Sequence, residues 1–273
     1  MKCHYPKILA WIAGFLLIAG FTTSHVVFAQ SNEIKIAKDK VDLSFKTLQL
    51  ATLPNNVRTA KYSLLTNVFD LLSLETQALE KQLTETAVNP EFTSLQLAMD
   101  DKLTTYLQYL VAQKKLLTVN LSLADIETIG GNFTNWREKE YNPHIQKVID
   151  LVSVFTGDAV LKKADARFTN IFESFKQFKG GKEQTTLLRG LLSQAALNLK
   201  TARQLQYQAE NKLSEYLPKN DTVTTETTNG DSPAPDQNQI NQIEPTIQDL
   251  FAATMTAVKS CYQNFISMYD ALD

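Results

Sequence analysis

The sequence predicts an all-α protein: an elongated bundle of about six or seven helices with long antiparallel hairpins, preceded by a signal peptide. Three observations support this fold class. Long segments repeat apolar residues every three or four positions, which is the period of a helix with one buried face. The alternating apolar and polar pattern of a half-buried strand is absent. Prolines and paired glycines separate the helical segments from one another.

The N-terminus has the three parts of an export signal. Lys2 and Lys7 give a positive start, an apolar run extends over residues 8–21, and Ala29 supplies the small residue that precedes a cleavage point. We expect cleavage after Ala29. The alternative is an uncleaved anchor formed by residues 8–29, whose length is close to the roughly 20 residues that cross a bilayer.

Polar residues from Thr22 to His25 interrupt the apolar run, which favours cleavage over anchoring. The protein is therefore expected to be exported (periplasmic, extracellular or envelope-associated), and to be membrane-anchored only if residues 8–29 stay attached. Cleavage removes Cys3 and leaves Cys261 as the single cysteine, so no disulfide can form within the mature chain. Packing must then supply the stability, and a chain of this length can bury a sufficient core.

Two long amphipathic helices are predicted between Pro54 and Leu117. The first begins at Pro54, because proline fits the first turn of a helix. The Asn89-Pro90 pair ends it, since a proline disfavours helical geometry in the preceding residue, and a second helix follows to Leu117. A short turn between two long helices favours an antiparallel hairpin. A weaker apolar stripe over residues 33–50 predicts a third helix beside them.

Glycine and proline interrupt the middle of the chain. We expect Gly130-Gly131 to break the helical pattern and Asn142-Pro143 to start a new, short helix. Gly157-Asp158 is interpreted as a further break, with Asp158 capping a helix that ends at Gly180-Gly181. That helix carries phenylalanines at helical spacing from Phe168 to Phe178.

The clearest repeat lies between Leu188 and Tyr216. Its residues alternate steps of four and three for about four heptads, which is the pattern of a coiled-coil-like seam. Gln206 is the one polar residue in this seam, and we interpret it as a flank or a register-setting contact. The alanines in the seam allow a neighbouring helix to approach closely, so we expect this helix to pack within a bundle.

Four segments follow from these patterns. Residues 1–29 form the signal peptide, and residues 30–217 form the helical bundle. Residues 218–245 are rich in Thr, Asn, Asp, Gln, Ser and Pro, a composition that predicts a flexible polar linker. Residues 246–273 are predicted to form an amphipathic helix that packs back on the bundle or on a partner, because its apolar stripe would otherwise face water.

The charge of the chain implies no strong electrostatic partner. Removing the two lysines of the signal from 27 basic residues leaves 25 against 29 acidic ones, which gives a mature net charge of −4. Nucleic-acid binding needs a basic stripe. The nearest candidates, Lys162-Lys163 and the lysines from Lys176 to Lys182, are interleaved with acidic residues and are interpreted as solvated helix faces. We expect no nucleic-acid partner.

Candidate catalytic and metal-binding residues are scarce. His144 is the only histidine after the signal is removed, and no cysteine lies near it in sequence, which argues against a zinc site. His144 follows Pro143 in the first turn of a helix, where we expect it at the surface and not beside a nucleophile. No glycine-rich phosphate loop and no Gly-x-Ser-x-Gly motif is present. The sequence therefore predicts no enzyme, no metal site and no cofactor.

Aromatic residues give the candidate interaction surface. Trp136 is the only tryptophan outside the signal, and Trp and Arg are enriched at interaction hot spots. The alternative, which we favour, is that Phe133 and Trp136 close one end of the core. The C-terminal helix supplies a second aromatic stripe. The full set of candidates is Phe133, Trp136, Arg137, Phe251, Tyr262, Phe265 and Tyr269.

The favoured functional hypothesis is an exported, non-enzymatic helical scaffold of the cell envelope that binds a protein partner or associates with itself. The alternative is a helical carrier or binding module for an apolar ligand, suggested by the phenylalanines from Phe168 to Phe178. A pocket lined by these rings favours the carrier, whereas a dense core excludes it. A membrane-active protein is less favoured, because the mature chain has no apolar segment of about 18 residues. Membrane contact is otherwise expected only through an uncleaved N-terminus.

Overall fold

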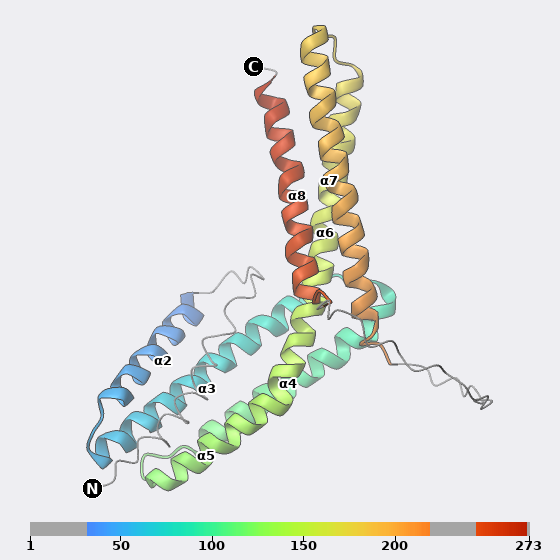
Figure 1. The fold of residues 1–273 in the computed structure, drawn as a ribbon. Coiled ribbons are helices and arrows are strands. Elements are labelled where there is room, and N and C mark those ends of the chain that lie inside the picture. Colours follow the sequence, from blue (N-terminus) through green and yellow to red (C-terminus); the bar gives the residue numbers. More distant parts are fainter. Residues whose placement is uncertain (1–31, 219–243, 272–273) are drawn as a thin grey trace, which may run out of the picture. The chain divides into compact units, whose positions relative to one another are not determined.

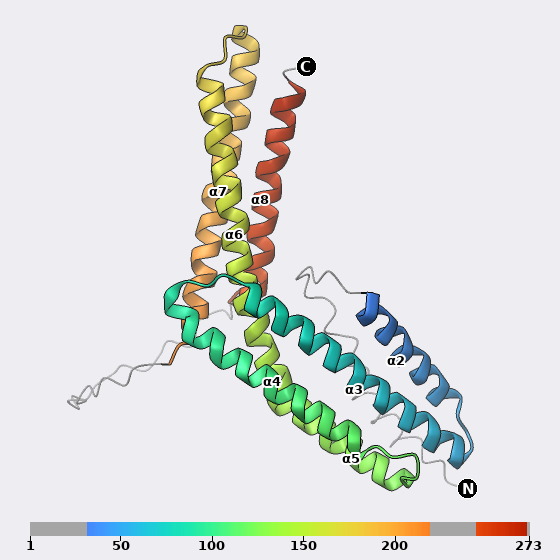
Figure 2. The same cartoon turned by 180° about the vertical axis from the view of Figure 1, so that it is seen from behind.

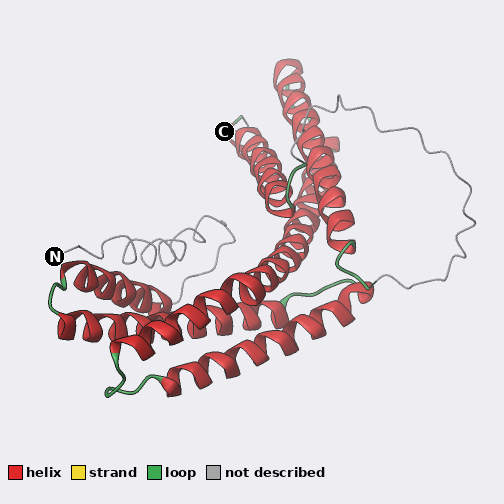
Figure 3. Cartoon of the chain, turned by 60° about the horizontal axis from the view of Figure 1, so that its bottom comes forward, coloured by secondary structure: helices red, strands yellow, loops and turns green. Residues whose placement is uncertain are grey.

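The computed structural model describes residues 32–218 and 244–271, and every regular element within them is helical (Figure 1). No strand occurs in this part of the chain (Figure 3). The prediction of an all-α fold is confirmed. The predicted signal peptide and nearly all of the predicted linker lie outside the described residues.

The chain divides into two compact units, Met1–Val152 and Ser153–Asp273, and the boundary falls within the long helix α6 (Asn142–Lys176). The sequence predicts one bundle over residues 30–217 and does not predict this division. Every residue from Val148 to Phe155 is buried, on both sides of the boundary. The sequence therefore shows no polar or glycine-rich break at this point.

The helices of the first unit, within its described residues, are arranged along the chain as follows. They are α2 (Asn32–Leu50), α3 (Pro54–Glu85), the short 3₁₀ turn η2 (Pro90–Phe92), α4 (Thr93–Leu116), α5 (Leu123–Trp136), the π-helix η3 (Arg137–Tyr141) and the start of α6. Helices α2, α3 and α4 lie side by side (Figure 2). α5, η3 and α6 follow one another without a gap and form one continuous helical stretch.

Side-chain contacts give the directions of these helices. Thr104 on α4 donates a hydrogen bond to Glu80 on α3 (2.8 Å), and Lys114, further along α4, forms an ion pair with Asp70, which lies earlier in α3. Positions therefore rise along α4 as they fall along α3, and the two helices run antiparallel. Asn67 of α3 reaches the hydroxyl of Ser44 on α2 at 2.7 Å.

α5 runs parallel to α3. Lys61 pairs with Glu127 (2.6 Å), and eight residues along α3 the ring of Phe69 meets that of Phe133 edge to face, with 4.7 Å between centroids. Both phenylalanines are fully buried in the core of this unit. Other fully buried members of that core are Leu64, Leu65, Val68, Leu110 and Ile126.

Two helix starts follow from local chemistry. Pro54 occupies the first turn of α3, as expected from its fixed φ and missing N–H. α5 begins with a capping box, in which the Ser122 hydroxyl accepts from the backbone N–H of Asp125 and the Asp125 carboxylate accepts from that of Ser122. These bonds satisfy amide groups that a helix start otherwise leaves unpaired.

Two predicted breaks do not exist. α5 continues through Gly130-Gly131, and α6 continues through Gly157-Asp158. The predicted helix start at Asn142-Pro143 coincides with the start of α6, but this helix has 35 residues and is not short. Glycine in a helix costs only about 1 kcal/mol relative to alanine, an amount that packing readily overcomes. Gly157 is present for packing, because a Cβ atom there would lie 2.7 Å from the side-chain oxygen of Gln206.

The second unit is built from the C-terminal part of α6, α7 (Lys182–Ser214) and α8 (Ile247–Asp270) (Figure 1). α7 runs antiparallel to both others: Gln206 reaches the Val154 carbonyl of α6, and Gln184 reaches the Ala271 carbonyl just after α8. The predicted heptad seam of α7 is buried from Leu188 to Leu213, Gln206 included. α8 starts with a capping box between Thr246 and Asp249.

Candidate ligand groove between α6 and α8

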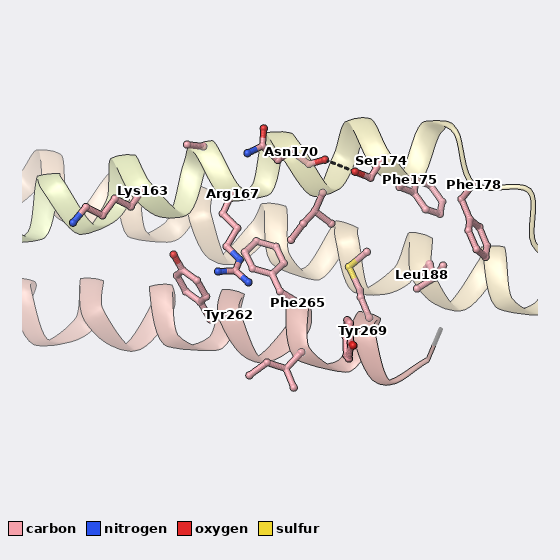
Figure 4. Close-up of a pocket in the computed structure, with 14 residues that line it drawn as sticks. Lys163, Arg167, Asn170, Ser174, Phe175, Phe178, Leu188, Tyr262, Phe265 and Tyr269 are labelled. Carbon is pink, nitrogen blue, oxygen red and sulfur yellow. Dashed lines mark hydrogen bonds between the residues drawn. The ribbon is translucent and has the colours of Figure 1, made fainter. Parts of the chain in front are cut away.

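A cavity of about 1050 Å³ lies in the second unit, lined by side chains from α6, α7 and α8 and by Phe178, which follows α6 (Figure 4). We call it the α6–α8 groove; 14 residues line it. Aromatic and aliphatic side chains dominate, among them Ile171, Phe175, Phe178, Phe265 and Met268. Its volume is at the upper end of the range of about 300–1,000 Å³ that is typical of small-molecule sites.

The residues of α7 explain where the groove opens. Around Ala195 and Ala202, small side chains let α6 and α8 approach closely, and Ala164 and Cys261 are completely buried there. Towards the start of α7 the seam changes to leucine. The cluster at that end has three buried residues, Leu188, Leu192 and Met268, with Phe168, Phe175 and Phe178 half-buried around them, and Phe172 is exposed. Three helices held apart by large side chains leave the space that the groove occupies.

The rings in and beside the groove contact one another. Tyr262 and Phe265 meet edge to face at 5.6 Å between centroids, and Phe265 lies 6.4 Å from the ring of Phe168. Phe168 in turn stacks on Phe172 at 6.1 Å. Such contacts fix ring positions and contribute about 0.5–1.5 kcal/mol each beyond the apolar area that they bury. The rings of Tyr262 and Phe265, on the α8 side of the groove, are therefore held in place before any ligand binds.

The charge of the groove is one-sided. Lys163 and Arg167 line it near one end, Phe175 and Phe178 lie towards the other, and no carboxylate is among the lining residues (Figure 4). The Arg167 guanidinium lies over the ring of Tyr262, 5.7 Å from its centroid. Within residues 32–218 and 244–271, neither Lys163 nor Arg167 forms an ion pair.

Acidic side chains on the same helix already have partners. Asp158 pairs with Lys162 at 2.7 Å, and Asp165 pairs with Arg203 of α7 at 2.6 Å. Glu173 pairs with Lys176 at 2.7 Å. The cations at the end of the groove therefore remain available to an anion from solution.

Three of the predicted interaction residues on α8 line this groove. Tyr262 is half-buried, Phe265 is 6% exposed, and Tyr269 is 68% exposed. Phe251 is half-buried and lies instead beside Gly157, where a Cβ atom would be 3.4 Å from its ring. The predicted aromatic stripe of α8 thus divides between helix packing and the wall of the groove.

The other predicted residues, Phe133, Trp136 and Arg137, belong to the first unit. Phe133 is 1% exposed and Arg137 is 8% exposed, and Trp136 is half-buried against Tyr109 at 4.1 Å between ring centroids. Phe133 therefore lies in the core of the first unit, and the half-buried Trp136 packs against that core. Burial lowers the pKa of Arg137, and its Nε atom has no hydrogen-bond partner among the described residues.

The sequence did not single out Lys163 and Arg167 as a site. A usable signal exists, because Lys163, Arg167, Ile171 and Phe175 are spaced four residues apart and so share one face of α6. An exposed Lys and Arg at that spacing are equally typical of a solvated helix face. Only the position of α8 beside that face distinguishes the two interpretations.

The remaining candidates for chemistry lie outside the groove. Burial, together with the nearby charge of Asp165, raises the pKa of the Cys261 thiol to about 11, so it stays protonated at ordinary pH. His144, in the first unit, has a ring nitrogen 3.4 Å from the Met99 carbonyl. In the described part of the chain, no three His, Cys, Asp or Glu side chains gather as metal ligands would.

No family model matches the chain, and no curated protein and no solved structure is similar enough to count as a match. Across residues 32–218 and 244–271, no helix combines the length and the apolar character needed to cross a membrane.

Proposed function

We propose that this protein is an exported, non-enzymatic helical carrier or binding module that takes an apolar ligand in the α6–α8 groove. The observation that carries the proposal is the cavity of about 1050 Å³, which is lined by Phe175 and Phe178 of the predicted phenylalanine stripe and by Tyr262, Phe265 and Tyr269 of α8. The sequence offers this function as an alternative, with a pocket beside those rings as the distinguishing feature. The groove favours it over the scaffold hypothesis.

A wide apolar groove exposes surface whose removal from water is favourable. Burial of apolar area contributes about 25 cal/mol per Å². The edge-to-face contact between Tyr262 and Phe265 orders part of the wall in advance, which reduces the ordering cost that binding otherwise incurs. A ligand with a long apolar surface matches this groove better than a compact polar one.

Export is the second part of the proposal. The Lys2–Ala29 segment has the charge, the apolar run and the small residue of a signal peptide. Expression in a bacterium with a general secretory system should yield protein that begins at Gln30, which N-terminal sequencing measures. A product that keeps Met1 and fractionates with membranes would replace the cleaved signal with the anchor of residues 8–29.

The test of ligand binding is titration with an environment-sensitive apolar dye. Ile171→Trp places a large side chain in the groove, whereas Leu187→Trp adds the same side chain at an exposed position of α7 that does not line it. We expect the dye to bind the unmodified protein and Leu187→Trp alike and to bind Ile171→Trp at least about tenfold more weakly, which corresponds to about 1.4 kcal/mol. Equal binding by all three proteins, with unchanged circular dichroism, would show that the groove is not the site.

A second candidate function remains, the protein scaffold. It is supported by large apolar side chains that α7 and α8 expose to solvent. These are Leu187, Leu197, Tyr207, Ile266 and Tyr269. Crosslinking with mass spectrometry in the native envelope, together with light scattering, tests it: a strict monomer without partners at working concentration counts against this candidate.

A further inference from the structure

We infer that the ligand of the α6–α8 groove is a long-chain carboxylic acid, bound with its carboxylate at Lys163 and Arg167 and its acyl chain directed towards Phe178. This inference rests on the proposed function and specifies the chemistry of the ligand.

The charges of the groove favour a ligand with an anionic end. The groove is apolar over most of its length, yet Lys163 and Arg167 lie near one end and no acidic side chain lines it (Figure 4). The carboxylates nearest to them in sequence, Asp158 and Asp165, are already paired with Lys162 and Arg203. A ligand with one anionic end and one apolar end therefore complements the groove, whereas a neutral hydrocarbon leaves both cations unused.

The geometry of the cationic end favours a carboxylate. The Arg167 guanidinium lies over the Tyr262 ring, which restricts its position beside α8. A guanidinium presents paired N–H groups that match the two oxygens of a carboxylate. Lys163, one helical turn earlier on the same face, adds a second charge without demanding a fixed geometry.

The length of the groove limits the length of the acyl chain that it can hold. Arg167 and Phe178 are eleven positions apart, which corresponds to roughly 16 Å at about 1.5 Å per residue. An extended chain advances about 1.2 Å per bond. The apolar part of the groove therefore accepts an acyl chain of about 14 carbons, and further carbons extend beyond Phe178.

An anionic membrane surface agrees less well with these observations than a single fatty-acid molecule does. Attraction to a bilayer depends on clusters of about four to eight basic residues. Here two cations stand at the end of an apolar groove, in a chain whose net charge is −2. The arrangement suits one monomeric amphiphile, and the experiment below includes vesicles so that the two sources of anion are distinguished.

The chain-length experiment uses titration calorimetry at pH 8 with saturated fatty acids of increasing length, each below its micelle concentration, and with the matching primary alcohols. Each added methylene should tighten binding by roughly threefold to fourfold, because burying one CH₂ group contributes about 0.8 kcal/mol. The gain should stop at about 14 carbons, where the estimated length of the groove ends. A gain that continues unchanged well beyond that length would contradict the assigned orientation.

The head-group experiment compares acids with alcohols in three variants. We expect acids to bind about tenfold more tightly than alcohols, because charge-assisted hydrogen bonds to a carboxylate are stronger than hydrogen bonds to a neutral hydroxyl. Arg167→Gln should weaken acid binding much more than alcohol binding and so remove most of this preference, and Lys163→Gln should reduce the preference less. Lys162→Gln is the matched control, because Lys162 pairs with Asp158 and does not line the groove.

The outcomes separate this inference from the proposed function. If alcohols bind as tightly as acids, the groove is a ligand site but the carboxylate assignment is wrong. If neither acids, alcohols nor the apolar dye bind, the proposed function fails. Binding to anionic phospholipid vesicles without binding to monomeric acids, and with Arg167→Gln unaffected, would overturn the inference in favour of a membrane surface.

Discussion

Individual glycines in this chain have different reasons to be present. A Cβ atom at Gly131 would have nothing within 4 Å, whereas one at Gly157 would lie 2.7 Å from Gln206 Oε1 and 3.4 Å from the Phe251 ring. Both positions are helical. Gly131 therefore incurs the entropy cost of glycine without a packing benefit, while Gly157 allows α6 to approach its neighbours.

This contrast predicts opposite responses to alanine. Gly131→Ala should raise the free energy of unfolding by about 1 kcal/mol, the difference in helix propensity. Gly157→Ala should give no such gain, because the buried Gln206 side chain has to move. Urea unfolding followed by circular dichroism measures the free energy of unfolding of both variants. Equal stabilisation by the two substitutions would show that the Gln206 side chain moves away at little cost in free energy.

His144 predicts a dependence of stability on pH. Burial lowers its pKa, as do the charges of Lys102 and Lys147, although a hydrogen bond to the Met99 carbonyl acts in the opposite direction. Its ring also meets that of Tyr106 edge to face at 5.5 Å. The charged form is thus less favourable in the folded state than in the unfolded chain, where the pKa is about 6.5.

The unfolded chain therefore binds more protons than the folded one below about pH 6.5. The stability that neutral His144 permits is complete above that pH and decreases as the pH falls through the lowered pKa of the folded state. We expect His144→Gln to lose less stability than the unmodified protein between about pH 7 and pH 5. Thermal melts at matched pH values measure the difference, in which the titration of other groups cancels. Parallel profiles would contradict the prediction.

At the scale of helices, apolar spacing predicted most of the secondary structure. The heptad seam of α7 is buried at its predicted positions from Leu188 to Leu213, whereas Tyr216 is half-buried beyond the end of the helix. Pro54 marks the start of α3, as predicted. The breaks at Gly130-Gly131 and Gly157-Asp158 were wrong, because a glycine that terminates a helix and one that admits a neighbouring helix look the same in sequence.

Two other features could not be predicted from the sequence. The π-helix Arg137–Tyr141 widens one turn, and no residue type marks such a turn. The phenylalanine stripe suggested a groove, but its cationic end did not stand out from an ordinary solvated face. Which helix covers a face depends on tertiary packing, and that information is not local in sequence.

Gln206 joins α7 to α6 and allows this packing to be measured. Its side chain is 4% exposed, and its Nε2 donates to the Val154 carbonyl at 2.8 Å and to Glu210 at 3.1 Å. Gln206→Ala leaves a cavity and should cost about 2–4 kcal/mol, whereas Gln206→Leu preserves most of the volume and should cost less than about 1.5 kcal/mol.

The same side chain should determine the response at Gly157. In the Gln206→Ala background the close oxygen is gone, so Gly157→Ala should become stabilising by about 1 kcal/mol. A double-mutant cycle by urea unfolding isolates this coupling between the helices. Strict additivity of the two substitutions would contradict the contact on which the prediction depends.

At the scale of the whole chain, each unit contains a buried apolar cluster of its own. Leu65 is fully buried in a cluster of α2, α3, α4 and α5 side chains, and Leu199 is 1% exposed in a cluster of α6, α7 and α8 side chains. Regions with separate cores tend to open as separate cooperative units, each with its own free energy of opening.

Cavity-forming substitutions in each core test this behaviour. Leu199→Ala should cost about 2–5 kcal/mol in the second unit, and the loss of amide protection should concentrate in α7 and α8, while α2 and α3 keep theirs. Leu65→Ala should give the converse pattern, which makes each variant the control for the other. Hydrogen exchange followed by mass spectrometry resolves the helices. If either substitution lowers protection equally in all of them, the chain unfolds as one cooperative unit, because local opening can change only the exchange of amides that open together.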